Sequence, residues 1–185
     1  MASNIEIKAR IDGVDAVATL VASLATGGPM LIVQDDTFFR CDEGRLKLRA
    51  FATGDGELIY YRRPDDDGPK TSFYLRSPTS APDVLRESLT LAYGQCGRVR
   101  KTRTVYLIGR TRVHLDHVEG LGEFLELEVV LRDDEPEHAG VAEANALMRA
   151  LSIAPERLVS GAYVDLLRAT FDEDVERDTL HEVNP

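Results

Sequence analysis

Charged and apolar side chains alternate along four segments of this sequence, and the charged residues are of the types that bind phosphate and metal ions. The segments are NIEIKAR at 4–10, RLKLR at 45–49, RTRVHLD at 110–116 and ELE at 126–128. Because successive side chains of a β-strand point to opposite faces, each segment would gather its charges on one face. Arginine and lysine bind phosphate oxygens, and paired carboxylates bind divalent cations. The pattern therefore predicts chemistry on a multiply charged anion.

A sheet with one solvated face would show the same alternation, and for a single strand that is the simpler interpretation. The four segments together favour a different one, because the charges segregate by strand. The charged set comprises Lys8, Arg10, Arg45, Lys47, Arg49, Arg110 and Arg112 with Glu6, Asp116, Glu126 and Glu128. Like charges two residues apart on an open strand gain nothing from each other. A polyphosphate enclosed by the sheet, with divalent cations, would bring both kinds of charge into one cavity.

The elements that must position these residues follow from the same periodicity. Period-two alternation predicts strands at 4–11, 45–51, 57–63, 71–76, 98–108, 110–117 and 123–131. An eighth strand is predicted at 32–40, around a turn at Asp35 and Asp36. Helical spacing predicts helices between Asp12 and Gly27, at about 81–93 and about 136–151, and a shorter one after Ser160. This order predicts an α+β domain whose antiparallel sheet closes into a barrel.

Composition and charge narrow the classes of function. The 185 residues, of which 43% are hydrophobic and 29% charged, are typical of one globular domain. The net charge of −10 argues against general binding to nucleic acid or anionic membranes, although residues 1–112 hold 17 basic and 14 acidic side chains. Cys41 and Cys96 form no CxxC motif, and no apolar run is long enough to span a membrane. We expect a cytoplasmic protein without disulfides or a thiolate metal site.

Several short motifs occur in an order that is typical of one protein family. NIEIK, RLKLR, GPK, RKTR, TRVHLD and GLGEFLELEV resemble, in that order, the motifs of the CYTH superfamily, which includes class IV adenylyl cyclases and triphosphatases such as thiamine triphosphatase. The resemblance covers about residues 4–168, and the block HLDHVEGLGEFLELE is most similar to the cyclase branch. It implies a triphosphate tunnel, a closed antiparallel barrel of about eight strands. We expect a CYTH domain at 1–171 and an acidic tail at 172–185.

The resemblance also implies roles for individual residues, beside one or two Mg²⁺ or Mn²⁺ ions. The metal-binding set would be Glu6, Asp116, Glu126 and Glu128. The phosphate-binding set would be Lys8, Arg49, Lys70, Lys101, Arg103 and Arg112. Within these sets Lys8, Arg49 and Glu6 would serve catalysis.

Two features depart from the family pattern. Asn4 stands where the family has the first Glu of its ExExK motif, and an amide is a poorer ligand for a hard cation than a carboxylate. In addition, Lys101 and Arg103 share strand parity with Val99 rather than with the neighbouring arginines Arg98 and Arg100. That parity suggests a β-bulge or a different register.

Three other patterns have simpler interpretations. His114 shares a predicted face with Asp116 and could ligate a transition metal or carry a proton, but a structural hydrogen bond is favoured because no second spaced histidine accompanies it. The acidic run at 65–67 precedes Gly68 and Pro69, which is typical of a solvated loop. Of Tyr60 and Tyr61, alternation allows only one to face a cavity.

Three functions follow from such a cavity. The leading hypothesis is a class IV-type adenylyl cyclase, which converts ATP to cyclic AMP and pyrophosphate. The second is a triphosphatase that hydrolyses inorganic, thiamine or nucleoside triphosphate, because the same cavity supports both outcomes. The third is a non-catalytic binder of triphosphate or polyphosphate, which Asn4 makes plausible. In each case the partner is a small-molecule triphosphate. The sequence is also compatible with a homodimer.

Overall fold

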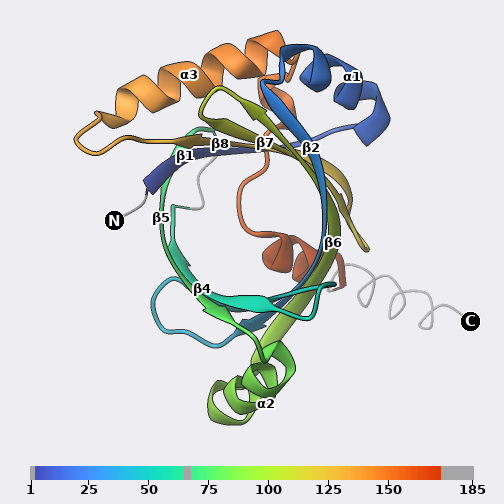
Figure 1. Cartoon of the computed structure of the whole chain (residues 1–185), viewed down its shortest axis with the longest axis vertical. Helices are drawn as coiled ribbons and strands as arrows, with labels where there is room; N and C mark the ends of the chain where they lie inside the picture. The colour runs from blue at the N-terminus through green and yellow to red at the C-terminus, as the bar shows by residue number, and fades with distance from the viewer. Residues whose placement is uncertain (1–2, 65–67, 172–185) are drawn as a thin grey trace, which may run out of the picture.

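The computed structural model describes residues 3–64 and 68–171, and its strands form a closed antiparallel barrel, as predicted (Figure 1). Around the barrel the strand order is β1-β5-β4-β3-β2-β6-β7-β8, so that β8 pairs with β1. The strands are β1 (Ser3–Arg10), β2 (Gly27–Phe39), β3 (Arg45–Phe51), β4 (Gly56–Arg62), β5 (Lys70–Thr79), β6 (Gln95–Ile108), β7 (Thr111–Val118) and β8 (Gly122–Val130).

Helices cover the outside of the barrel. Helices α1 (Val14–Leu24) and α3 (Glu137–Ala150) lie over β1, β7 and β8, while α2 (Pro82–Tyr93) packs against β2 and β3 on the opposite side (Figure 1). A 3₁₀ turn at Pro155–Arg157 follows α3. None of the helices in the described part of the chain is both long and apolar enough to cross a membrane.

The main hydrophobic core lies between the barrel and these outer helices. Ile5, Ile7, Leu125 and Leu127 point outward from β1 and β8 and are fully buried against α1 and α3. Each such side chain contributes about 1.5–3 kcal/mol when it is removed from water. Since the apolar face of these strands is outside, alternation turns their charged face toward the interior of the barrel.

Strand β2 corrects one prediction. The turn expected at Asp35 and Asp36 is wrong, because β2 runs through both residues and pairs there with β3 on one side and β6 on the other. Asp35 accepts hydrogen bonds from Arg98 on the outside of the barrel, and the buried Asp36 accepts them from Lys47 and Arg49. Each carboxylate has its cations on a neighbouring strand, so two adjacent acids are stable in an extended backbone.

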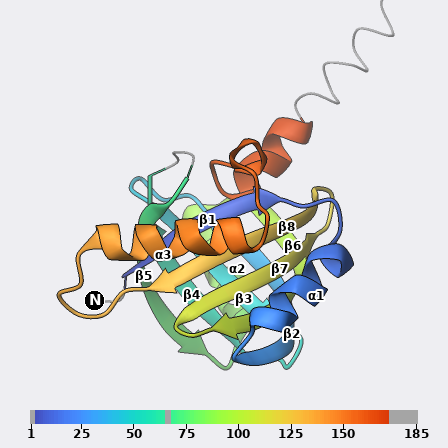
Figure 2. The same ribbon diagram turned by 90° about the horizontal axis from the view of Figure 1, so that it is seen from above.

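One end of the barrel is covered by the segment after Ser160. Residues 163–171 are helical, as expected, and Figure 2 shows this helix at the end of the strands. Ala162, Tyr163 and Val164 pack against Phe38 and Val99 in a second hydrophobic cluster. The acidic run at 65–67 and the predicted tail at 172–185 lie outside the described residues.

Candidate active site

A cavity of about 460 Å³ lies inside the barrel and receives side chains from all eight strands. This volume is within the range of small-molecule sites. Eight of the residues predicted for the site line it: Glu6, Lys8, Arg49, Lys101, Arg103, Arg112, Glu126 and Glu128. The strands therefore bring most of the predicted set together in one cavity, with its charges pointing inward.

Lys70 and Asp116 are the two predicted site residues that do not line the cavity. Lys70 is buried at the start of β5, opposite Glu6 in the register. Asp116 is fully buried and accepts hydrogen bonds from Lys101 Nζ at 3.1 Å, Arg103 Nε at 2.6 Å and the Tyr163 hydroxyl at 3.0 Å. Burial opposes ionisation, but Arg103 and Lys101 outweigh it and lower the pKa of Asp116 to about 2. In this structure Asp116 orients two of the predicted phosphate-binding cations.

The acidic part of the cavity comes from β1 and β8. Glu6 lies opposite Glu128 in the register, and Lys8 lies opposite Glu126. Every one of these carboxylates has a cationic partner: Glu6 pairs with Arg63 at 3.1 Å, Glu126 with Arg103 and Lys8, and Glu128 with Arg112 at 2.8 Å.

These cations keep the buried carboxylates ionised. Burial alone would raise the pKa of Glu126, but Arg103 and Lys8 hold it well below its usual value. Burial acts in the same way on Glu128, whose pKa is lowered by His114 and Arg112. Both groups are therefore present as carboxylates at neutral pH.

Asp36 holds the cations of β3 and is a residue that the sequence reasoning missed. Its carboxylate accepts hydrogen bonds from Lys47 Nζ at 2.7 Å and from Arg49 Nε and Nη2 at 2.8 and 2.9 Å. Burial opposes its ionisation, but Arg49 and Lys47 lower the pKa of Asp36 far below its usual value. Asp36 shares strand parity with Gln34 and Phe38, so period-two spacing could have placed it on the inner face.

The lysines of the cavity are crowded by other cations. Burial, together with neighbouring Arg49, lowers the pKa of Lys47 to about 7 despite Asp36. Burial likewise lowers the pKa of Lys8 to about 8, and burial with Arg103 lowers that of Lys101. Excess positive charge is costly in a buried site, so a bound anion would stabilise the charged form of each lysine.

Tyr163 enters the cavity from the segment that covers the end of the barrel. Its ring centre lies 4.0 Å from Lys8 Nζ and 4.9 Å from Lys101 Nζ, which are cation–π distances. Lys8 also donates to the carbonyl of Gly161 at 3.0 Å. No strand periodicity signals Tyr163, because it belongs to a helix packed across the barrel end.

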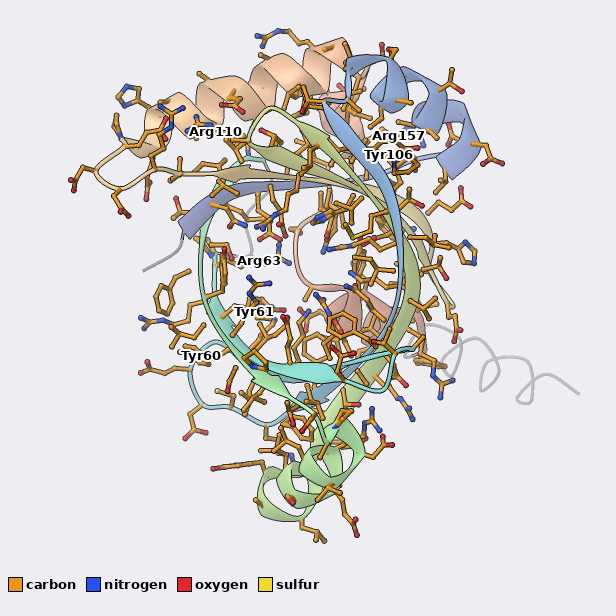
Figure 3. The ribbon with its side chains drawn as sticks, viewed as in Figure 1. Tyr60, Tyr61, Arg63, Tyr106, Arg110 and Arg157 are labelled. Carbon is orange, nitrogen blue, oxygen red and sulfur yellow. The ribbon has the colours of Figure 1, made fainter. Side chains whose placement is uncertain are left out.

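Arg63 and Tyr61 point into the barrel, whereas Tyr60 points outward (Figure 3). The prediction that one tyrosine of the pair faces the cavity is confirmed. Arg63 donates from Nη1 to Glu6 at 3.1 Å and from Nη2 to the carbonyl of Gly161 at 2.7 Å. Arg63 was missed, although it lies two residues after Tyr61 and shares its parity.

Strand β6 resolves the question of parity. Val99, Lys101, Arg103 and Val105 all line the cavity, and the pairing of β6 with β2 is regular from Val99 to Val105. Neither a bulge nor a different register is needed there. The neighbouring arginines face outward, where Arg98 pairs with an aspartate of β2.

Asn4 and His114 carry buried polar atoms that make no hydrogen bond within the described residues. These atoms are Asn4 Oδ1 and His114 Nδ1, and both residues line the cavity. His114 Nδ1 lies 3.7 Å from Glu126 Oε2 and 3.9 Å from Glu128 Oε1, beyond hydrogen-bond distance. Two polar atoms thus face the acidic part of the cavity without a partner among the described residues.

The donor set of this region suits a hard divalent cation in kind. Carboxylates of Glu6, Glu126 and Glu128 enter one cavity from adjacent strands, beside the unpartnered Asn4 Oδ1. Oxygen donors of this sort are the ligands of Mg²⁺ and Mn²⁺. Among residues 3–64 and 68–171, no three His, Cys, Asp or Glu side chains already form a metal-binding group. Each of these carboxylates already pairs with an arginine. A bound metal ion would therefore compete with Arg63, Arg103 and Arg112 for the carboxylate oxygens.

A closed eight-stranded barrel with a charged interior defines a class of triphosphate tunnel proteins. The family model described as the CYTH domain matches residues 2–163, and this chain belongs to the CYTH family. Members of this family include adenylyl cyclases and triphosphatases and generally depend on a divalent metal ion.

Individual proteins are similar to this chain in sequence or in fold. The chain is 29% identical over 142 residues to adenylate cyclase CyaB of Aeromonas hydrophila, covering 71% of this chain and 70% of that one. Among solved structures, the PH1012 protein of Pyrococcus horikoshii is similar with a TM-score of 0.80 and 22% identity, covering 89% of this chain and 99% of that one. The Hippeastrum protein HpAC1, described as having a dominant triphosphatase activity, is similar with a TM-score of 0.66 and 15% identity, covering 92% and 96%.

Proposed function

We propose that this chain is a cytoplasmic, divalent-metal-dependent adenylyl cyclase that converts ATP to cyclic AMP and pyrophosphate. The observation that carries the proposal is a single cavity whose lining combines cations from several strands with the apolar side chains of Met30, Ile32 and Val105 toward one opening. The cationic region suits a triphosphate chain, and the apolar end suits a nucleoside.

The apolar end lies away from the segment that covers the barrel. Phe38, near the end of β2, packs against Ala162 and Tyr163, so Met30 and Ile32 near the start of β2 lie toward the opposite opening. Met30 is 61% exposed, consistent with a position at a rim. Across the β2–β6 pair, Val105 lies opposite Met30 and also lines the cavity. These side chains offer a nucleobase an apolar surface that inorganic triphosphate does not need.

The phosphate chain would lie among the cations of β1, β3, β6 and β7. We propose that Arg49, Arg103 and Arg112 bind phosphate oxygens through their planar guanidinium groups, together with Lys8 and Lys101. On the family resemblance, we propose Lys70 as a further phosphate contact. Asp36 would hold Arg49 in position, and Asp116 would hold Arg103 and Lys101, because each carboxylate accepts hydrogen bonds from those side chains.

We propose that Glu6, Glu126 and Glu128 hold the metal ion. Asp116 is linked to this group through Arg103, which donates to both Asp116 and Glu126. A bound divalent cation would neutralise phosphate charge in the transition state. Asn4 Oδ1 could add a neutral ligand, because it is buried without a partner among the described residues.

The reaction requires positioning and charge neutralisation more than covalent help from the protein. The ribose 3′ oxygen attacks the α-phosphorus and forms the cyclic ester bond while its proton passes to water. The bond from the α-phosphorus to its bridging oxygen breaks, and pyrophosphate leaves with that electron pair. Arg49, Arg103 and Arg112 stay charged throughout, so they stabilise the negative charge that grows on the leaving group.

Triphosphate hydrolysis is the second candidate, because the same cations would stabilise attack by water on the γ-phosphorus. The name of the Aeromonas relative supports the cyclase, whereas HpAC1 is described as having a dominant triphosphatase activity. Product identification separates the two. Purified protein is incubated with ATP, inorganic triphosphate or thiamine triphosphate, each with Mg²⁺ or Mn²⁺. Cyclic AMP with pyrophosphate supports the proposal, while inorganic phosphate without a cyclic product supports the hydrolase, and binding without turnover supports a binder.

The metal assignment has its own test. Replacing Glu126 and Glu128 by glutamine keeps their size but removes both charges, and we expect the variant to lose metal-dependent turnover. In electron paramagnetic resonance spectra, we expect Mn²⁺ to be free in solution with the double variant and bound with the wild type. Unchanged Mn²⁺ binding by the double variant would contradict the assignment.

A further inference from the structure

A second cavity adjoins the tunnel at its covered end and has a lining rich in arginine. Its volume is about 530 Å³, and it lies between the β2–β3 connection, the start of β6 and the helix at 163–171. Its charged lining residues are Arg40, Arg45, Arg63, Arg168, Asp42 and Asp165. With four positive and two negative side chains, the lining carries a net positive charge, and such a surface attracts anions.

Two of these arginines are already paired with acids. Arg45 binds Asp165 at 2.7 Å, and Arg63 binds Glu6 at 3.1 Å. The other two have no acidic partner within the described residues. Arg168 donates to the carbonyl of Cys96, and the exposed Arg40 makes no ion pair with any residue in the ranges 3–64 and 68–171. Arg40 and Arg168 can therefore turn a guanidinium toward a ligand without abandoning a carboxylate.

Arg63 links the second cavity to the tunnel. Arg63 and Phe38 line both cavities, and the Arg63 side chain is only 4% exposed. Its Nη atoms donate to Glu6 and to the carbonyl of Gly161, but its buried Nε has no acceptor among the described residues. A buried N–H without an acceptor is costly, and an anion beside Arg63 would satisfy it.

We propose that this second cavity is an anion site for pyrophosphate. The planar guanidinium groups of Arg40 and Arg168 match phosphate oxygens, and a diphosphate is long enough to contact more than one arginine. The site itself is independent of the reaction in the tunnel. Its role as a docking place for the released pyrophosphate rests on the proposed function, because only the cyclase releases pyrophosphate from ATP.

The test is a calorimetric titration of the whole protein with pyrophosphate in the presence of EDTA, so that no metal-dependent turnover occurs. The wild type should bind two equivalents per chain, one in each cavity. The variant Arg40→Gln with Arg168→Gln should weaken the second site at least about a hundredfold, because each charge-assisted contact is worth about tenfold or more. The matched control is Arg132→Gln, which removes the same charge from an exposed residue that lines neither cavity.

The outcomes separate the two proposals. Two equivalents in the wild type and control but one in the double variant support the second site. If the wild type binds a single equivalent and the double variant binds none, the second site is supported and pyrophosphate binding in the tunnel is contradicted. Equal binding by the double variant and the wild type overturns the second site. Since Arg168 also contacts Cys96, Arg40→Gln alone should weaken the site about tenfold, and inorganic phosphate should bind it more weakly than pyrophosphate does.

Discussion

Triphosphate binding should weaken as the pH rises from 7 to 9, because Lys47 loses its charge in this range. Burial and Arg49 lower the pKa of Lys47 to about 7 in the ligand-free protein. A triphosphate in the cavity would raise that pKa again, so binding takes up a proton. The contribution of Lys47 to triphosphate affinity is therefore fully present below about pH 7. It is lost as the pH rises from 7 toward the higher pKa that Lys47 has in the complex.

The magnitude follows from the charged fraction of Lys47. With a pKa of about 7, about half of the molecules carry the charge at pH 7 and about one in a hundred at pH 9. The contribution of Lys47 to affinity should therefore fall about fiftyfold over this range, or about 2.3 kcal/mol. Lys47→Arg is the matched variant, because arginine keeps its charge at pH 9.

The assay is calorimetric titration with tripolyphosphate at pH 7, 8 and 9, in buffers of different ionisation enthalpy that report proton uptake. The titrations of the ligand and of Lys8, whose pKa is about 8, affect both proteins equally, so the ratio of wild-type to Lys47→Arg affinities isolates Lys47. That ratio should fall steeply with pH, and the variant should take up about one proton fewer at pH 8 to 9. A ratio independent of pH would refute the reasoning.

Three further changes test separate parts of the structure. Asp36→Asn leaves Lys47 and Arg49 without their carboxylate, and urea unfolding should show a loss of about 3–5 kcal/mol in the free energy of unfolding; a loss below 1 kcal/mol would contradict this role. Leu127→Ala, at a fully buried site outside the barrel, should lower the same quantity by about 2–5 kcal/mol while turnover per folded molecule stays unchanged. Asn4→Glu adds a carboxylate beside Glu6 and should tighten Mn²⁺ binding and raise turnover, whereas weaker Mn²⁺ binding would contradict the proposed metal position.

Strands β1 and β8 were predictable because charged and aliphatic residues alternate along them. Glu6 and Lys8 on β1, and Glu126 and Glu128 on β8, alternate with aliphatic residues that must be buried somewhere. Alternation fixes which side chains share a face, but it leaves open which face is inside the barrel. Helices α1 and α3 decide this, because they cover the aliphatic face and leave the charged face to the cavity.

Asp36 and Tyr163 show why part of the site was not predicted. Two adjacent acids are typical of a turn, and only the cations of a neighbouring strand explain why Asp36 lies in the middle of β2. Tyr163 reaches Lys8 because a terminal helix packs across the barrel end, a contact between residues far apart in the sequence. Local periodicity contains no information about the cations that pair with Asp36 or about the contact between Tyr163 and Lys8.

The central claim is that a triphosphate lies inside the barrel, between the arginines and the carboxylates of β1 and β8. A crystal structure of the protein with Mn²⁺ and a non-hydrolysable ATP analogue tests it most directly. We predict that the phosphate chain contacts Arg49 and Arg103, and that the anomalous signal of Mn²⁺ lies beside Glu6 and Glu128. An analogue bound on the outer surface, with the interior cations still paired only to their own carboxylates, would contradict the claim.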